Sequence, residues 1–200
     1  MSAVSHERWL QAQAAEFEEY RDHNIQHSQD RFGKTFELLG VDPKVDFKDK
    51  VIVEVAAGSV PGVLMAEGAK RRIAIEPLMA KWHDQRKYCE EQGVEVIAEA
   101  YEYLDIEEEV DETWFFNCIE HVIDPVEQLQ KAMATSKVVR VFEATNGLAP
   151  SVAHPHTITK ELITDVMGDF GQVYVGGSVY KTNFHQSDCY YGTWVKDDVQ

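Results

Sequence analysis

Glutamates and small residues gather where two buried strands are expected to end. Glu54 lies inside the apolar run 51–55, which leads into the small-residue loop 56–62, and Glu76 follows the expected strand 72–75. Backbone N–H groups of such a loop can hold an anionic group, and a carboxylate about 20 residues later accepts hydrogen bonds from ribose hydroxyls. A buried carboxylate is costly unless it is paired, which favours a functional role for Glu54. The pattern predicts a site for a ribose-containing ligand.

Three histidines are candidate catalytic residues. His154 and His156 follow the fifth expected strand, and His121 follows Glu120 after the fourth. An imidazole has an ordinary pKa near ~6.5, so any of the three can act as a general base on a hydroxyl or an amine. A role in stabilising a turn or satisfying the core is the alternative for each. The His154-x-His156 spacing also suits a metal, but no third ligand is nearby, so we expect no metal site.

The elements that must position these residues alternate between strands and helices. Runs rich in β-branched and aromatic residues predict strands at 51–55, 72–75, 94–97, 113–116 and 138–142. Helical spacing predicts helices at 61–67, 78–92, 125–134 and 160–167. We therefore expect an α/β fold with a doubly wound, Rossmann-like, mostly parallel sheet. Two further runs, 172–180 and 189–196, predict an antiparallel C-terminal hairpin that completes a seven-stranded sheet.

The N-terminal segment predicts a helical flank with two helices between residues 6 and 39. Ser5 is a suitable N-cap for the first helix, and Gly40 suits the end of the second. We expect Trp9, Phe17 and Tyr20 to pack the helices, with a lid over the ligand as the alternative. No repeat or low-complexity linker interrupts the chain, which predicts a single domain made of a helical cap (1–47), a ligand-binding core (48–168) and a hairpin (169–200).

Composition limits the possible partners. Nineteen Lys and Arg against 35 Asp and Glu give a net charge of -16, which disfavours nucleic acid. No apolar window approaches the ~20 residues of a membrane helix, so we expect no membrane partner. Three cysteines without a CxxC pair suggest reduced thiols and a cytoplasmic protein. The oligomeric state is left open.

Four segments together resemble the class I S-adenosylmethionine-dependent methyltransferases. They are VIVEVAAGSVPGVL, RIAIEPLMAKW, NCIEHVIDPVEQL and HPHTITKELI, which span residues 50 to 167 in the order and spacing of that family. The resemblance implies S-adenosylmethionine as cofactor, S-adenosylhomocysteine as product, and a small-molecule acceptor whose attacking atom is open. It places the methionine part near the first loop, the ribose at the second strand and the adenine at the third. The implied cofactor-binding residues are Glu54, Ala56, Gly58, Glu76, Pro77, Ala100, Tyr101, Glu102 and Asn117.

Two positions depart from the family pattern. The family usually has Gly where Ala56 stands and often an acidic residue where Ala100 stands. If the backbone at position 56 requires a positive φ, an Ala is disfavoured there. These departures motivate an alternative, a non-catalytic methyltransferase-like binding module. A hydrolase or lyase that consumes S-adenosylmethionine is a more remote alternative, and a nicotinamide enzyme is disfavoured because GxGxxG cannot be written in the first loop.

Overall fold

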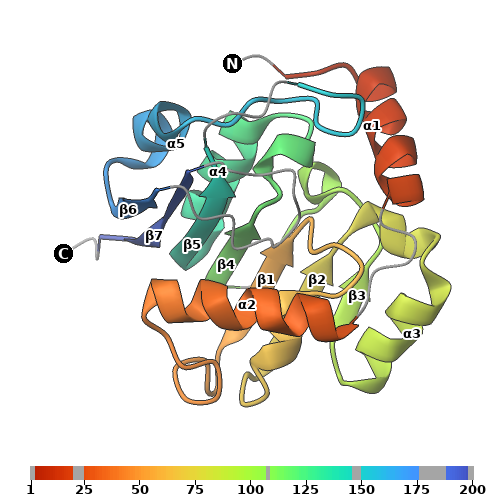
Figure 1. The fold of residues 1–200 in the computed structure, drawn as a ribbon. Helices are drawn as coiled ribbons and strands as arrows, with labels where there is room; N and C mark the ends of the chain where they lie inside the picture. Colours follow the sequence, from red (N-terminus) through yellow and green to blue (C-terminus); the bar gives the residue numbers. More distant parts are fainter. Residues whose placement is uncertain (1–2, 20–24, 107–108, 146–149, 176–187, 198–200) are drawn as a thin grey trace.

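A sheet covered by helices on both faces forms the body of the protein (Figure 1). The structure, a computed structural model, describes residues 3–19, 25–106, 109–145, 150–175 and 188–197. The strands are β1 (Val51–Val55), β2 (Arg71–Ile75), β3 (Glu95–Ile97), β4 (Val110–Phe116), β5 (Ser136–Ala144), β6 (Gly171–Tyr174) and β7 (Cys189–Val195). The α-helices of the described residues are α1 (His6–Glu19), α2 (Ile25–Leu39), α3 (His83–Glu91), α4 (Pro125–Thr135) and α5 (Lys160–Met167).

The strand order is β3-β2-β1-β4-β5-β7-β6. Strands β1 to β5 run parallel, whereas β7 lies antiparallel between β5 and β6. This arrangement confirms the expected doubly wound sheet with an antiparallel C-terminal end. The chain order reverses between β1 and β4, and ligands bind beside the carboxyl ends of strands at such a switch point. The topology therefore selects the carboxyl ends of β1 and its neighbours as the place to look for a site.

One face of the sheet packs against α2 and α3. Trp114 and Phe116 point to this face from β4, and Phe36 of α2 meets both rings edge-on at centroid distances of 5.4 and 5.8 Å. The opposite face carries the alternate side chains, among them Phe115, and packs against α4 and α5 through a second apolar cluster. The period-two alternation along β4 thus divides the core into two layers.

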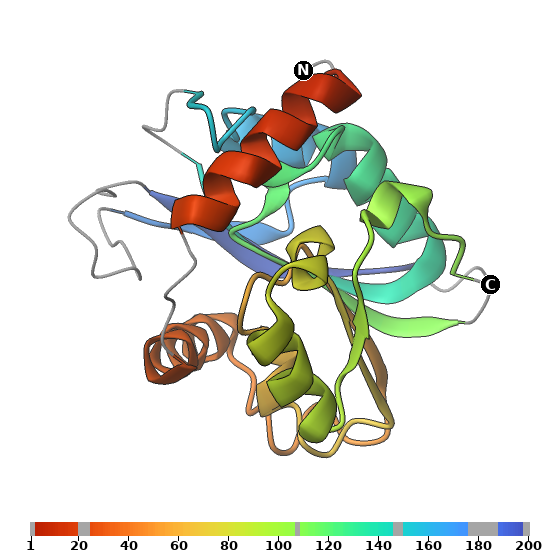
Figure 2. The same cartoon turned by 90° about the vertical axis from the view of Figure 1, so that its right-hand side faces the viewer.

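The N-terminal helices take two different places. Arg8 donates its backbone N–H to Ser5 Oγ over 3.2 Å, which confirms the expected cap of α1, and α2 ends at Leu39 before Gly40 with φ +68°. Figure 1 shows α2 crossing one face of the sheet, whereas Figure 2 shows that α1 lies apart from α2. None of the helices among the described residues has the length and hydrophobicity needed to span a membrane.

Two expected helices are shorter than the sequence predicts. The helix expected at 61–67 is a single 3-10 turn, Gly62–Met65, and α2 covers this part of the chain. A Cβ added at Gly62 would lie 2.9 Å from the Phe32 ring, so only glycine fits beneath that side chain. The helix expected at 78–92 is split into a 3-10 turn, Pro77–Ala80, and α3, because Trp82 has a non-helical ψ of 68°.

A buried ion cluster lies at the start of β4, where the sequence predicts a strand only from residue 113. Strand β4 begins at Val110, and Glu112 is fully buried within it. Arg140 donates from Nε to Glu112 Oε2 over 2.6 Å, and Lys50 donates to Oε1 over the same distance. Although burial raises the pKa of Glu112, these cations outweigh it and hold the pKa below its usual value. The expected hairpin run 172–180 forms a strand only to Tyr174, and residues 176–187 lie outside the described part of the chain.

Removing Arg140 alone should lower the free energy of unfolding far more than removing Arg140 and Glu112 together. We expect Arg140→Met to lower the free energy of unfolding by about 3 kcal/mol, because it leaves the Glu112 carboxylate buried without its main partner. The double variant Glu112→Leu with Arg140→Met should recover most of that loss. Urea unfolding of the three proteins measures this, and equal losses in the single and double variants would contradict the ion-cluster account.

Candidate functional site

A narrow pocket lies at the carboxyl ends of β1, β2 and β3, between the sheet and α1. Its walls comprise three residues of α1, the ends of the strands, and the turns that follow β3 and β4. They are Trp9, Gln13, Glu16, Val55, Ala56, Ile75, Glu76, Pro77, Ala100, Tyr101, Glu102, His121 and Val122. The enclosed space is about 20 Å³, which is room for about one water molecule. Helix α1 therefore closes the pocket at the topological switch point.

Glu76 directly follows β2 and is one of three glutamates that line the pocket. It is 3% exposed, and its two carboxylate oxygens accept backbone N–H groups from Gly58 and Leu78, each over 2.9 Å. Burial, and next the charge of Glu16, raise the pKa of Glu76 to about 7. Each carboxylate oxygen has a second lone pair, so Glu76 can also accept a hydrogen bond from a ligand hydroxyl.

Glu54 is hydrogen-bonded to the backbone of the loop that follows its own strand, β1. It is 1% exposed, and its oxygens accept backbone N–H groups from Gly62 over 3.0 Å and from Val63 over 2.8 Å. Burial raises its pKa to about 7. The backbone donors expected to hold a ligand anion thus bind the Glu54 side chain. Glu54 is not among the residues that line the pocket, and its contact with the site runs through the loop that it holds.

Ala56 occupies the strained position that the sequence raised as a possibility. Its φ is +45°, in the left-handed region that favours glycine, and it lines the pocket. Gly58, two residues on, has φ +67°, which costs a glycine nothing. Asn117, at the end of β4, is likewise strained with φ +56°, and its Nδ2 donates to Glu120 Oε1 over 3.3 Å. Strained non-glycine backbone thus marks the ends of the two strands at the switch point.

The turn after β3 supplies one wall. Ala100, Tyr101 and Glu102 all line the pocket, as does Pro77 opposite them. The Tyr101 hydroxyl points away toward Thr135, at 3.5 Å, so this side chain offers the pocket its ring rather than its oxygen. Glu102 Oε1 accepts the Ile123 backbone N–H over 2.8 Å.

The three candidate histidines differ in their access to the pocket. His121 lines it and is 7% exposed, with Nδ1 lying 3.3 Å from Glu16 Oε2 and 3.2 Å from the Ala153 carbonyl. Burial lowers the pKa of His121, but Glu16 and Glu120 outweigh it and leave the pKa above its ordinary value. His156 does not line the pocket, and its Nε2 lies 2.9 Å from the Val122 carbonyl.

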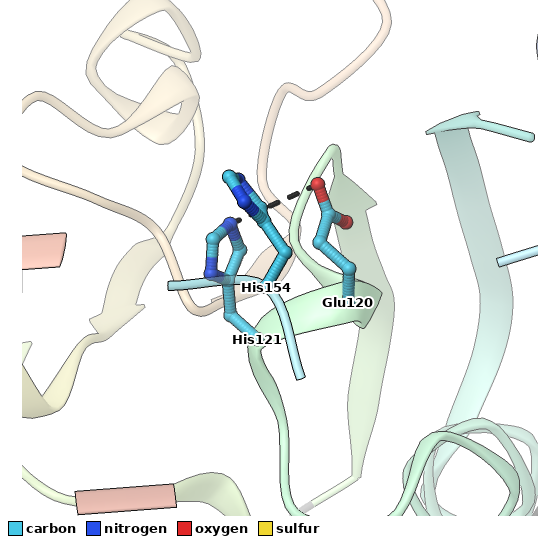
Figure 3. A group of neighbouring side chains, drawn as sticks. All are labelled: Glu120, His121 and His154. Carbon is cyan, nitrogen blue, oxygen red and sulfur yellow. Dashed lines mark ion pairs between the residues drawn. The ribbon is translucent and has the colours of Figure 1, made fainter. Parts of the chain in front are cut away.

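His154 lies next to His121 but does not line the pocket. The two rings are 4.8 Å apart between centroids, and Glu120 completes the group (Figure 3). The expectation of no metal site considered only the pair His154 and His156, whereas the structure groups His154 with two residues of another segment. The partners are Glu120 and His121, whereas His156 takes no part in the group.

Comparisons by sequence find nothing: neither a protein-family model nor a curated protein sequence matches the chain. Comparisons of the structure find methyltransferases. The 1,6-didemethyltoxoflavin-N1-methyltransferase of Burkholderia thailandensis, with bound S-adenosylhomocysteine, is 15% identical and has a TM-score of 0.62, covering 99% of this chain and 92% of that one. A possible histamine N-methyltransferase of Thermotoga maritima is 14% identical with a TM-score of 0.60, covering 94% and 99%.

A third structure is larger than this chain. Phosphoethanolamine N-methyltransferase 1 of Haemonchus contortus is 12% identical, with a TM-score of 0.70, and the match covers 98% of this chain but 51% of that one. This chain has the fold of the class I S-adenosylmethionine-dependent methyltransferases. The expectation about the fold that arose from the sequence resemblance is thereby confirmed.

Within this methyltransferase fold, the structure brings only some of the predicted residues to one pocket. Those that line it are Ala56, Glu76, Pro77, Ala100, Tyr101, Glu102 and His121. Those that do not are Glu54, Gly58, Asn117, His154 and His156. Two pocket residues of α1, Gln13 and Glu16, were not predicted at all. The only signal for them was the helical spacing that places Trp9, Gln13 and Glu16 on one face of α1.

The strain at Ala56 predicts an unusual response to glycine in this methyltransferase fold. We expect Ala56→Gly to raise the free energy of unfolding by about 1 kcal/mol, because a left-handed φ costs an L-residue about 1–2 kcal/mol. The neighbouring Ala57→Gly is the matched control and should lower it by about 1 kcal/mol, because it frees the unfolded chain and removes a buried methyl group. Chemical denaturation measures both, and a loss of stability in Ala56→Gly as large as that in Ala57→Gly would contradict the strain.

Proposed function

We propose that this protein is an S-adenosylmethionine-dependent methyltransferase that acts on a small molecule. The observation that supports this most strongly is the place of the pocket, which lies at the switch point of a methyltransferase fold with Glu76 at the end of β2. A carboxylate at that point suits the two hydroxyls of a ribose. When bound, S-adenosylmethionine supplies an electrophilic methyl group on a positively charged sulfur.

The charge of the pocket suits a cationic ligand. Carboxylates of Glu16, Glu76 and Glu102 all line it. S-adenosylmethionine carries a sulfonium and an ammonium group, and nearby anions stabilise both. Methyl transfer asks little else of a protein than to align the acceptor with the methyl carbon and to exclude water.

Helix α1 must move before a ligand of this size can enter. Hydrogen bonds tie the start of the chain to the core: Val4 N–H donates to the Ile123 carbonyl over 3.0 Å, Trp9 Nε1 to the His121 carbonyl over 3.1 Å, and Arg8 to the carbonyls of Ser151 and Val152. Further along the helix, Glu16 pairs with His121 over 3.3 Å and Phe17 stacks on Trp82, so contacts along the length of α1 must break when it moves. We propose that α1 opens to admit the cofactor and then covers it.

The acceptor is proposed to bind at the His121 end of the pocket. Of the three candidate histidines, His121 alone lines the described pocket, which makes it the one nearest to an acceptor. The methyltransferases with this fold include one named for the small molecule 1,6-didemethyltoxoflavin, which supports a small-molecule acceptor here. The acidic composition disfavours nucleic acid, and the buried free thiols of Cys89, Cys118 and Cys189 support a cytoplasmic location.

A non-catalytic binding module is the second candidate. It is favoured by the strained Ala56 and by the backbone hydrogen bonds that already occupy both oxygens of Glu76. Such a module would keep the fold and the pocket without affinity for S-adenosylmethionine. Cofactor binding therefore separates the two candidates.

Isothermal titration with S-adenosylhomocysteine should show one binding site that depends on Glu76. We expect Glu76→Gln to weaken binding about 10- to 100-fold, because charge-assisted hydrogen bonds are worth about 1.5–3 kcal/mol. The exposed Glu95→Gln, whose carboxylate pairs with Arg71, is the control and should bind like the wild type. No binding by the folded wild type would favour the non-catalytic module.

The same titration at two pH values tests the state of Glu76. Its pKa is about 7 and its ionised form is the better acceptor for hydroxyls, so affinity should rise between pH 6 and pH 8. This rise should be smaller in Glu76→Gln. A dependence on pH that is identical in the two proteins would remove Glu76 from the site.

A further inference from the structure

Two histidines and a glutamate converge beside the pocket from two separate segments. Glu120 and His121 belong to the turn after β4, and His154 comes from the loop before α5 (Figure 3). Their ligand atoms all lie within 4.8 Å of one another. We propose that Glu120, His121 and His154 bind a divalent transition-metal ion.

The donor set selects the class of metal. Two imidazoles and one carboxylate are the ligands of catalytic zinc and non-haem iron sites, which keep a further position open. Magnesium and calcium prefer oxygen ligands, so two histidines disfavour them. Tetrahedral ligands at zinc distances lie about 3.4 Å apart. His121 Nε2 and Glu120 Oε1 are 3.7 Å apart, and His154 is on a half-buried loop that can close the remaining distance.

Outer contacts orient both imidazoles. His121 Nδ1 faces the Ala153 carbonyl at 3.2 Å and Glu16 Oε2 at 3.3 Å, so an N–H at Nδ1 has acceptors and Nε2 is turned toward Glu120. His154 Nδ1 lies 2.9 Å from Ser151 Oγ. Histidines that bind metals almost always place the other ring nitrogen against a carboxylate, a backbone carbonyl or a similar group. Both outer contacts therefore fit a metal site.

Glu120 gives an independent indication. It is 3% exposed, and its Oε1 accepts from Asn117 Nδ2 over 3.3 Å. Its Oε2 is fully buried without a well-formed hydrogen bond, and the Glu120 carboxylate lies beside the carboxyl of Glu143. Two buried carboxyls this close are stabilised by a nearby positive charge, which a bound cation would supply.

The ion would lie at the edge of the pocket, because His121 belongs to both. An open coordination position there suits a ligand with an oxygen or nitrogen donor. If the proposed methyltransferase function holds, that ligand is the acceptor, and the ion would hold its hydroxyl or amine and lower the pKa of that group. This extension depends on the proposed function, whereas the metal site itself does not.

Cobalt titration of the chelator-treated protein tests the site without any cofactor. Co²⁺ bound by nitrogen and oxygen ligands in a site of low coordination number absorbs visible light, so binding can be followed directly. We expect one Co²⁺ per chain, and at least about 100-fold weaker binding in His154→Ala and in Glu120→Gln. His83→Ala, which removes an exposed histidine at the start of α3, is the matched control and should bind like the wild type.

Two checks keep the test decisive. Circular dichroism shows whether each variant is folded, and X-ray absorption of the Zn²⁺-loaded wild type, which needs no variant, should show two imidazole ligands. Absence of binding, equal binding in all variants, or a zinc environment without imidazole would overturn the proposal. The group would then be an ion pair of protonated His121 with Glu16 and Glu120. S-adenosylhomocysteine binding is measured separately, so failure of the metal site leaves the proposed function standing.

Discussion

Buried carboxylates hold the loops at the carboxyl end of the sheet. Each accepts backbone N–H groups from a loop that the sheet cannot itself pair, which satisfies both the anion and the backbone donors. The three that do so most clearly are Glu54, Glu76 and Glu143, and the half-buried Glu102 accepts one such N–H group. The pocket, its strained backbone and its histidines all depend on these loops keeping their places. A change from Glu to a neutral residue here would therefore disturb loop geometry as well as charge.

This arrangement explains why the pocket is both acidic and narrow. Glu76 fixes Gly58 and Leu78 and also faces the pocket, so one carboxylate serves the scaffold and the ligand together. Burial raises the pKa of Glu76 to about 7, so the position that serves both purposes disfavours the ionised carboxylate. Helix α1 covers the pocket and contributes Glu16, whose carboxylate pairs with His121 on the pocket wall. Opening of α1 would therefore alter the size of the pocket and the surroundings of the histidine in one movement.

The sheet could be predicted from the sequence and the loop contacts could not. A buried strand such as 51–55 can be recognised from its own residues, because all of them are apolar except Glu54, which has a hydrogen-bond partner. The partner of Glu54 is the Gly62 backbone eight residues away, in a turn that packs closely beneath the Phe32 ring. Likewise the spacing of His154 and His156 pointed to a pair, whereas the tertiary structure pairs His154 with His121. Contacts between separate segments carry no periodic signal.

We propose that the carboxyl ends of β1, β2 and β3 form the cofactor site beneath α1. Amide hydrogen exchange with and without saturating S-adenosylhomocysteine tests it most directly, because it locates a ligand without needing an acceptor. We expect slower exchange in segments 54–63, 76–80 and 100–104, together with a changed rate in α1. Unchanged exchange in those segments, or protection confined to α4 and α5, would contradict it.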